Sequence, residues 1–343
     1  MKVTVLLSLA PPDGTLRYVV HLTDGKAPGT RYKYFSWWTA LFGKYDVFHV
    51  HWPEQLVRGG NTFVRTTKRL LARLLLLRLR ISRIALVRTL HNLRPHEPGD
   101  AGEDAFLNRL DSETDLYIRL NPATPMDESR GVTILHGHYI GRYPTPAVTE
   151  PEPGRILYFG LIRPYKGVER LIEVFESIQS PELKLRIVGK PTVELRRLVE
   201  FAVNRDPRIS SLLEFVADDV LAAEVYRAQL VVLPYREMHN SGAILVALSL
   251  GRPVLVPRSV TNELLAAEVG PNWVNIFDGE LTKEAVLSAV KHCPRRDSAP
   301  PKLGGRDWDV VGQKHYEAYL RAMLSKNQAP PGRTNRDPEA TDL

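Results

Sequence analysis

The stretch of sequence that decides the fold is ILYFGLIRPYKGVERLIEVF, residues 156–175. It begins with a short apolar run, passes through a turn bounded by Gly160 and Gly167, and ends in apolar residues at helical spacing. A strand that turns through glycine into a helix is the repeating unit of doubly wound α/β sheets, which bind ligands beyond the carboxyl ends of their strands. The stretch therefore predicts a parallel sheet with a ligand site near residues 160–167.

The rest of the second half repeats this rhythm of short apolar strands and amphipathic helices. The expected strands are 156–159, 183–188, 213–216, 230–234 and 254–256, and the expected helices are 168–179, 193–204, 220–228 and 243–250. Alternation of this kind favours one doubly wound domain.

The first half shows the same alternation, with expected strands at 3–9, 47–51, 84–90, 116–119 and 131–135. The Pro-rich segment PTPAVTEPEPG, residues 144–154, has no periodicity and is typical of a linker. We therefore predict an α/β protein of two Rossmann-like doubly wound domains. The expected parts are an N-terminal domain 1–148, a linker 149–154, a C-terminal domain 155–307, a helix 308–325 that returns to the N-terminal domain, and a disordered tail 326–343.

The composition is that of a globular protein with anionic partners. Of 343 residues, 43% are hydrophobic and 25% are charged, and Lys and Arg exceed Asp and Glu by 46 to 39. The single cysteine, Cys293, excludes an intramolecular disulfide and fits a structural thiol in a reducing compartment. The apolar N-terminus could imitate a signal peptide, but a first strand is the better interpretation, so we expect a cytoplasmic protein.

Two segments of the second half carry residues suited to phosphate. Arg163 can clamp two phosphate oxygens, and Lys166 can add a point charge to the same diphosphate. The segment 235–243, YREMHNSGA, precedes the helix 243–250, whose first amide groups can bind an anion at the positive end of the helix dipole. Either feature alone is commonly a solvated turn or a plain helix cap. Together at strand ends of one sheet, they favour a diphosphate site.

At this point the sequence resembles a family. FGLIRPYKGVERLIEVF, LKLRIVGKP, VVLPYRE and SGAILVALSLGRPVLVP are similar, in order, to landmarks of the GT-B glycosyltransferases of the glycosyltransferase 4 type. The resemblance implies two domains facing a cleft, of which 1–148 is the acceptor domain and 155–307 the nucleotide-sugar-binding domain. It also implies a nucleotide-sugar co-substrate and no required metal or cofactor. The donor-binding residues that it implies are Gly160, Arg163, Lys166, Gly189, Lys190, His239, Asn240, Ser241, Gly242 and Ala243.

One departure from the family pattern concerns the nucleotide. The family has two glutamates eight residues apart, of which the second binds the ribose, and that position is Val246 here. Glu237 lies one residue from the expected first glutamate, where a contact with the sugar is expected. Another group must therefore recognise the ribose.

The N-terminal motifs HVHWPE (49–54), HNLRPHE (91–97) and HGHY (136–139) resemble those of bacterial GDP-mannose:glycolipid mannosyltransferases. The resemblance implies mannose from GDP-mannose as the transferred hexose and a saccharide or lipid-linked acceptor. His51, His91, Glu54 and Glu237 are the candidate catalytic residues, of which a histidine or carboxylate could deprotonate the acceptor. The candidates for acceptor or cleft contacts are His49, Trp52, Asn92, His136, His138 and Tyr139. For His49 or His91 a purely structural role is equally open, and a metal site is disfavoured because the spacings match no zinc signature.

The segment 63–81, FVRTTKRLLARLLLLRLRI, is basic and rich in leucine. No acidic residue lies between Glu54 and Glu97, whereas this interval contains Arg58, Arg65, Lys68, Arg69, Arg73, Arg78, Arg80, Arg83, Arg88 and Arg94. Its charges exclude a transmembrane span. Two interpretations of this segment remain open. It could be a helix that lies on an anionic membrane surface, as in a peripheral protein at the inner face of a membrane. It could equally be a helix that packs on the sheet with its basic face in solvent.

Rival functions follow from the same features. A sugar-nucleotide epimerase of the same fold would use the donor without an acceptor. A non-catalytic nucleotide-sugar-binding protein would keep the pocket without turnover, and a nucleic-acid-binding protein, suggested by net charge alone, would need exposed aromatics among its basic residues. We therefore expect a glycosyltransferase of polysaccharide biosynthesis that binds no nucleic acid.

Overall fold

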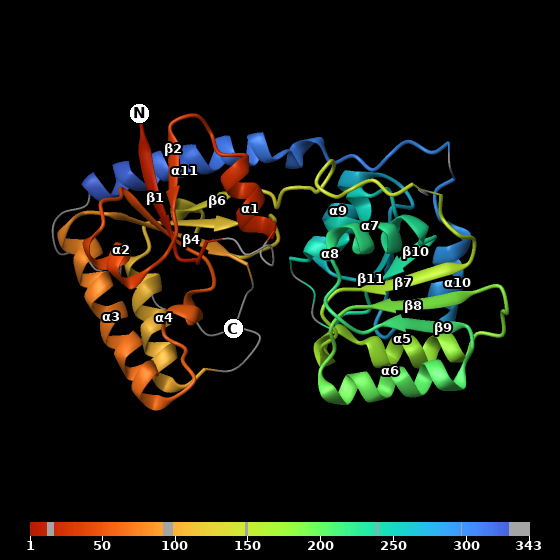
Figure 1. Ribbon diagram of the computed structural model, residues 1–343. Helices are drawn as coiled ribbons and strands as arrows, with labels where there is room; N and C mark the ends of the chain where they lie inside the picture. Colours follow the sequence, from red (N-terminus) through yellow and green to blue (C-terminus); the bar gives the residue numbers. More distant parts are fainter. Residues whose placement is uncertain are drawn as a thin grey trace. The chain divides into compact units, whose positions relative to one another are not determined.

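The computed structural model describes residues 1–11, 17–91, 99–147, 150–236, 238, 240–295 and 297–328. The chain divides into two compact units, unit 1 of residues 1–137 and 305–343 and unit 2 of residues 138–304. Each unit contains one six-stranded sheet whose strands all pair in parallel (Figure 1). Two parallel sheets covered by helices are the GT-B architecture that the sequence predicts, and the fold class is confirmed.

Unit 1 has the strand order β2-β1-β3-β4-β5-β6. Its strands are β1 (Val3–Leu7), β2 (Thr30–Lys33), β3 (Val47–Val50), β4 (Ala85–Leu90), β5 (Leu116–Arg119) and β6 (Gly131–Thr133). Its helices are α1 (Arg17–Asp24), α2 (Trp37–Phe42), α3 (Thr62–Ile81), α4 (Ala101–Glu113) and α11 (Trp308–Gln328). The strand β2, which the sequence did not indicate, forms one edge of this sheet.

The sheet of unit 1 is apolar on both faces, as expected for a parallel sheet covered by helices. Successive side chains of a strand point to opposite faces, so Val47 packs with α1 and α11 while Phe48 packs with α2, α3 and α4. Figure 1 shows α11 on one side of the sheet and α3 and α4 on the other. This alternation also places His49, two residues after Val47, on the α11 face.

Unit 2 has the strand order β12-β11-β10-β7-β8-β9. Its strands are β7 (Arg155–Phe159), β8 (Lys184–Val188), β9 (Ile209–Leu212), β10 (Leu230–Val232), β11 (Val254–Pro257) and β12 (Val274–Phe277). Its helices are α5 (Val168–Glu176), α6 (Val193–Arg205), α7 (Asp218–Arg227), α8 (Gly242–Ser249), α9 (Val260–Val269) and α10 (Lys283–Lys291). The helices α5 and α6 cover one face and α7, α8 and α9 the other, which is the doubly wound arrangement (Figure 1).

The predicted strand 213–216 is wrong, because β9 comprises Ile209–Leu212 instead. Asp206 Oδ1 accepts the amide hydrogen of Arg208 at 2.9 Å, and this turn starts the strand directly after α6. Ile209 is then buried opposite Leu185, whereas Phe215 is exposed beyond the end of the strand.

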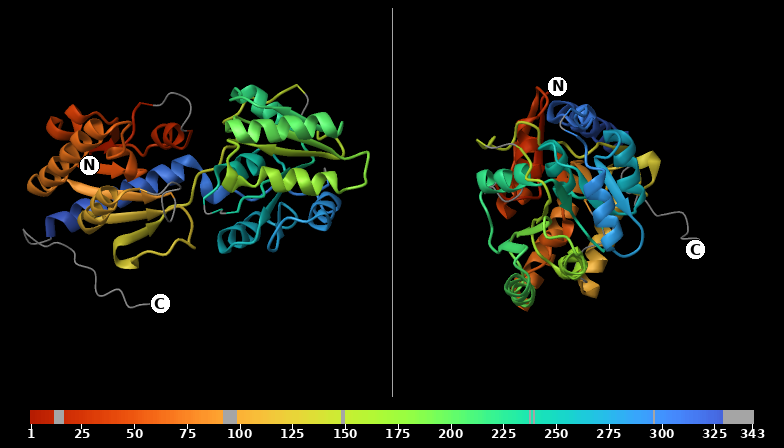
Figure 2. Two further views of the ribbon diagram at one scale, coloured as in Figure 1. Left: turned by 90° about the horizontal axis from the view of Figure 1, so that it is seen from below. Right: turned by 90° about the vertical axis from the view of Figure 1, so that its right-hand side faces the viewer.

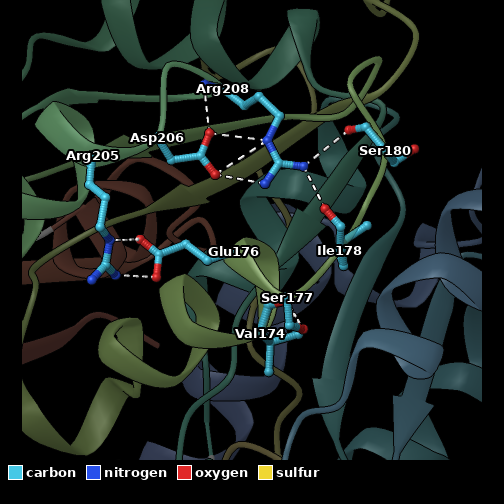
Figure 3. A network of polar contacts seen from close by, with 8 residues as sticks. All are labelled: Val174, Glu176, Ser177, Ile178, Ser180, Arg205, Asp206 and Arg208. Carbon is cyan, nitrogen blue, oxygen red and sulfur yellow. Dashed lines mark hydrogen bonds and ion pairs between the residues drawn. The ribbon is translucent and has the colours of Figure 1, made fainter.

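A polar network fixes the turns at the edge of unit 2 where β9 begins (Figure 3). The Arg208 guanidinium binds the Asp206 carboxylate at 2.6 Å and donates to the carbonyls of Ile178 and Ser180. Arg205 pairs with Glu176 at the ends of α6 and α5. This edge lies opposite the carboxyl ends of the strands, so it anchors the sheet without occupying the candidate site.

The division between the units falls at residues 137 and 138, before the boundary near 148 expected from the Pro-rich segment. The segment after residue 137 packs into unit 2, since Tyr139 and Tyr143 lie in its core and the Tyr139 amide donates to Ser249 Oγ at 2.9 Å. In unit 1, Trp308, Val311 and Tyr319 of α11 lie in one apolar core with residues of β1 and β4. Figure 2 shows this helix, in blue, along the sheet of unit 1. Residue 149 of the expected linker and residues 329–343 of the expected tail lie outside the described residues. Residues 326–328 of that tail belong to α11, so the helix is longer than expected.

Cys293 is half-buried in unit 2, and its thiol contacts the carbonyls of Gln229 and Ala289. Burial raises the pKa of this thiol to about 12, so it stays protonated and unreactive at neutral pH. These contacts support the structural role expected from the sequence. Among the described helices, none is both long and apolar enough to cross a membrane.

Candidate functional site

The carboxyl ends of β7 and β10 lie side by side at the centre of unit 2. These strands pair directly, and the chain proceeds from β7 toward β8 and β9 but from β10 toward β11 and β12. The strand order therefore reverses between them, and such a switch point is where open α/β sheets bind ligands. The two segments that the sequence singled out, 160–167 and 235–243, both start at this point.

Two glycines allow the backbones after β7 and β8 to approach each other. Gly160 and Gly189 have φ angles of +111° and +142°, which are unfavourable for residues with a side chain. A Cβ atom on Gly189 would lie 1.8 Å from the Gly160 carbonyl oxygen, and one on Gly160 would lie 3.7 Å from Lys166 Nζ. The predicted residues Gly160, Gly189 and Lys166 are thus neighbours in the structure.

Arg163 and Lys166 form a pair of cations without a carboxylate partner among the described residues. Arg163 Nη1 donates to the carbonyls of Ile162 and Lys190 at 2.9 and 3.2 Å. Lys166 Nζ lies 4.7 Å from the centre of the Tyr235 ring. Burial, followed by the charge of Arg163, lowers the Lys166 pKa to about 8. Two half-buried cations that repel each other are stabilised when an anion binds between them.

The segment after β10 reaches the same place. The Arg236 amide donates to the Tyr165 carbonyl at 2.8 Å, which ties this segment to the turn after β7. Helix α8 begins at Gly242, and the Ser241 side chain makes no capping hydrogen bond. The first amide groups of α8 therefore keep their capacity to bind an anion. A Cβ atom on Gly242 would lie 3.5 Å from the Tyr139 hydroxyl, which brings Tyr139 to this helix end.

The other predicted donor-binding residues differ in how far their side chains are exposed. Ser241, Gly242, Ala243 and Asn240 are half-buried, and the Lys190 side chain is exposed, so Lys190 contributes its carbonyl oxygen to Arg163. Glu237 and His239 lie outside the described residues. Val246 is buried in the core of unit 2, which explains why an apolar residue occupies the position of the family's ribose glutamate.

In unit 1, β3 and β4 carry a cluster of buried histidines. His49 is fully buried, with Nδ1 2.9 Å from the Tyr319 hydroxyl and Nε2 2.7 Å from Thr89 Oγ1. Burial holds its pKa well below the usual value. Because both ring nitrogens are bonded inside the core, these contacts support the structural role for His49.

His51 and His91 form a hydrogen-bonded pair, with His51 Nδ1 2.8 Å from His91 Nε2. His51 is buried, whereas His91 is half-buried and stacks on the Trp52 ring at a centroid distance of 4.1 Å. Burial lowers the pKa of His51 to about 3 and that of His91 well below its usual value, so both rings are neutral at pH 7. Of the two, only His91 has appreciable exposed surface.

The remaining N-terminal candidates lie apart. His136 is half-buried in unit 1, with Nδ1 2.8 Å from the Gly137 carbonyl. His138 belongs to unit 2, is buried, and accepts the Ile140 amide hydrogen at 3.2 Å. Glu54 is half-buried after β3 and makes no ion pair within the described part of the chain. Asn92 lies outside it.

Sequence reasoning missed the aromatic residues that shape both clusters. Tyr235 directly follows the buried segment after β10, a signal that was available, and it packs under Lys166. Tyr18 lies within 5.2 Å of the His91 ring centre, and Tyr319 is bonded to His49, but neither has a sequence signal because both come from distant helices. No group of His, Cys, Asp or Glu in the described ranges is arranged to hold a metal ion.

Comparisons with known proteins agree with this geometry. Residues 153–291 match the family model described as "Glycosyl transferases group 1". A GDP-mannose:glycolipid 4-beta-D-mannosyltransferase of Xanthomonas campestris pv. campestris is 46% identical over 94% of this chain and 93% of its own length.

Solved structures share the fold at low identity. Alr3699/HepE of Anabaena, solved in complex with UDP, superposes with a TM-score of 0.62 at 16% identity, over 96% of this chain and 98% of its own. Sucrose-phosphate synthase of Thermosynechococcus elongatus gives a TM-score of 0.65 at 14% identity, over 95% and 100%. The sequence relative, the family model and the solved structures show that the chain is a GT-B glycosyltransferase and belongs to the family of the GDP-mannose:glycolipid mannosyltransferases.

Proposed function

We propose that this glycosyltransferase moves mannose from GDP-mannose to a lipid-linked saccharide. The activity in the name of its 46% identical relative supports the donor and the class of acceptor. The observation that carries the proposal is the pair of cations Arg163 and Lys166, which have no carboxylate partner in the described chain and lie at the β7–β10 switch point beside the start of α8.

These groups suit the chemistry of the leaving diphosphate. As the bond between mannose and the diphosphate breaks, negative charge develops on the leaving oxygen. The Arg163 guanidinium, the Lys166 ammonium and the first amides of α8 can stabilise that charge, and preorganised groups of this kind need little rearrangement during the reaction. We therefore expect transfer to proceed without a bound metal.

On the acceptor side, we propose His91 as the general base. GDP-mannose carries an α-linked sugar, so a β-linked product of the kind that the relative's name gives requires inversion by direct attack of a deprotonated hydroxyl. The neutral, half-buried His91 ring can accept the proton of the acceptor hydroxyl, and its Nε2 lies 2.8 Å from His51 Nδ1. His51 then positions the His91 ring. Glu54 is the alternative base.

A donor panel tests the nucleotide. The unfolding temperature of the protein should rise with GDP-mannose and GDP, and should rise less with UDP-glucose, UDP or ADP-glucose at equal concentration. A ligand that binds only the folded state stabilises that state. Transfer of labelled mannose to a lipid-linked acceptor extract should then follow the same order. A larger shift and faster transfer with a UDP-sugar would overturn the assignment of the donor.

A lipid-linked acceptor also implies where the protein works. We propose that it acts at the inner face of a membrane, on the cytoplasmic side, with an anionic lipid surface as a partner. The net charge of +7 and the basic helix α3 support this location.

A further inference from the structure

The backbone of Trp52, directly after β3, adopts a left-handed conformation. Its φ and ψ angles are 45° and 67°, a region that bulky side chains rarely occupy. Among the described residues other than glycine, only Trp52, Arg83 and Asn272 have a positive φ, and of these only Trp52 lies beside the candidate catalytic residues. Such a conformation is unfavourable and persists only where the surrounding structure enforces it, as it often does at functional sites.

The chain on both sides of Trp52 is fixed by buried contacts. Before it, the His51 amide donates to Ser8 Oγ at 2.8 Å, and the Ser8 hydroxyl donates to the His51 carbonyl at 2.9 Å. After it, the chain enters the 3-10 turn Pro53–Leu56, whose last side chain is buried in the core. These anchors hold Trp52 in its left-handed conformation and thereby set the direction of its side chain.

The Trp52 ring stacks on the ring of His91, which follows β4. The two ring centres are 4.1 Å apart and the planes differ by 16°. His51 contacts His91 in another way, through the hydrogen bond between its Nδ1 and His91 Nε2. The proposed general base therefore has a hydrogen-bond partner in the plane of its ring and an aromatic face parallel to that plane.

Deprotonation of the acceptor places a positive charge on His91. The proton of the acceptor hydroxyl passes to the imidazole, the hydroxyl oxygen bonds to the anomeric carbon, and the electron pair of the broken bond leaves with the diphosphate. Burial, followed by the charges of three neighbouring histidines, holds the His91 pKa well below its usual value and so disfavours this charge. The face of an indole ring favours it, because the ring quadrupole attracts a cation. The stack therefore stabilises the charged ring more than the neutral ring, which is what catalysis requires.

We propose that Trp52 is a positioning residue for the general base: its ring fixes the plane of His91 and stabilises the imidazolium that forms during transfer. This inference rests on the proposed role of His91. The rival role for a tryptophan at this place is direct stacking on a sugar of the acceptor. The geometry favours the first role, because the Trp52 ring is half-buried and already has an aromatic partner on one face.

A double-mutant cycle tests the proposal, because residues that act through one another have non-additive effects. Mannose transfer to a detergent-dispersed acceptor is measured for Trp52→Leu, for His91→Gln and for the variant that combines them. Trp52→Phe keeps an aromatic face. Trp52→Gly removes the ring and adopts a positive φ freely, so it provides a second variant without the ring if the leucine variant does not fold.

The matched control is Trp38→Leu, which removes a 75% exposed indole from α2 in the same unit. It should leave kcat and both KM values unchanged. Circular dichroism verifies that every variant compared is folded at the assay temperature.

We expect the loss of the Trp52 ring to lower kcat by about tenfold with unchanged KM for donor and acceptor, and Trp52→Phe to lower it by about threefold or less. In the His91→Gln background, Trp52→Leu should change kcat by less than about twofold.

A further fall of about tenfold in that background would overturn the proposal, because Trp52 would then act independently of His91. A higher acceptor KM with unchanged kcat would also overturn it and would assign Trp52 to the acceptor sugar. Full kcat in His91→Gln alone would overturn the proposed base and the role of Trp52 with it. A large loss in His91→Gln with additive effects would remove only the role of Trp52, so the two failures can be told apart.

Discussion

The two units build the same kind of sheet and place different chemistry at its strand ends. In unit 2, the turn after β7 holds two glycines and two cations without carboxylate partners in the described chain. In unit 1, the ends of β3 and β4 hold histidines that burial keeps neutral. A shared fold therefore does not set the role of a strand end. In the proposed mechanism, His91 of the first unit accepts the proton and the cations of the second unit stabilise the leaving diphosphate.

The largest expected effect comes from removing the two positive charges at the candidate donor site of unit 2. Arg163→Ala with Lys166→Ala should lower kcat/KM for the donor by about 10³-fold, because both cations stabilise the leaving diphosphate. The melting temperature without donor should hardly change. Lys184→Ala, an exposed residue at the other end of β8, is the control. Full activity of the double variant would remove both cations from the site.

A second substitution removes the proposed general base of unit 1. His91→Gln should lower kcat by about 10² or more while leaving the donor KM unchanged, since His91 acts on the acceptor. The matched variant is Glu54→Gln, and steady-state kinetics compares the two. If Glu54→Gln shows the large loss and His91→Gln does not, Glu54 is the base and the histidine pair is structural.

Two glycine substitutions should destabilise one unit each. In unit 2, a Gly189→Ala Cβ would lie 1.8 Å from the Gly160 carbonyl oxygen, and in unit 1 a Gly312→Ala Cβ would lie 1.7 Å from the Gly25 carbonyl oxygen. Each should cost roughly 2 to 5 kcal/mol of unfolding free energy. Urea unfolding followed by hydrogen exchange should locate the loss in the substituted unit. Gly60→Ala, with open space around its Cβ, should be close to neutral.

Acid should destabilise unit 1 before unit 2. The folded pKa values of His51 and His315 are lowered to about 3 and 4 by burial, whereas unfolded histidine titrates near 6.5. The unfolded state therefore binds protons first, and stability is lost as the pH falls from about 6.5 toward 4, by roughly 1.4 kcal/mol per histidine for each pH unit. Hydrogen exchange between pH 7 and 4.5 measures the loss of stability in each unit separately.

His315→Gln should reduce the slope of unfolding free energy against pH in unit 1 by the equivalent of about one proton, since it removes one buried titrating ring. His292→Gln, at an exposed position of unit 2, should leave the slope unchanged. Equal acid sensitivity of both units would show that the buried histidines do not govern it.

The smallest expected effect concerns the pH dependence of donor binding. The Lys166 pKa of about 8 means that the free protein loses this charge between pH 7.5 and 8.5, so donor affinity should fall by about threefold over that range. Isothermal titration with GDP measures the change. Lys166→Arg keeps its charge and should bind with little dependence on pH, and an unchanged threefold fall in that variant would assign the titration to another group.

Much of the fold could be predicted from periodicity. The apolar runs at β1, β3, β4, β5, β7, β8 and β11 were placed to within a few residues, because a strand buried on both faces needs a continuous apolar run. The edge strand β2, TRYK, was missed, because edge residues face solvent and lose that signal. The strand β9 was misplaced because exposed Phe215 imitates a core residue.

The sequence by itself predicted that the candidate donor residues Gly160, Arg163, Lys166 and the start of α8 lie at one end of the sheet of unit 2, because they follow strands that pair in parallel. Only the tertiary structure showed which histidines are buried, because the spacing of histidines in the sequence does not predict their burial. His49 is enclosed by Tyr319 and Thr89, whereas His91 keeps exposed surface. It also divided the leucines of α3 between the core and the exposed face of the helix, because that division depends on where α4 and the sheet lie against the helix.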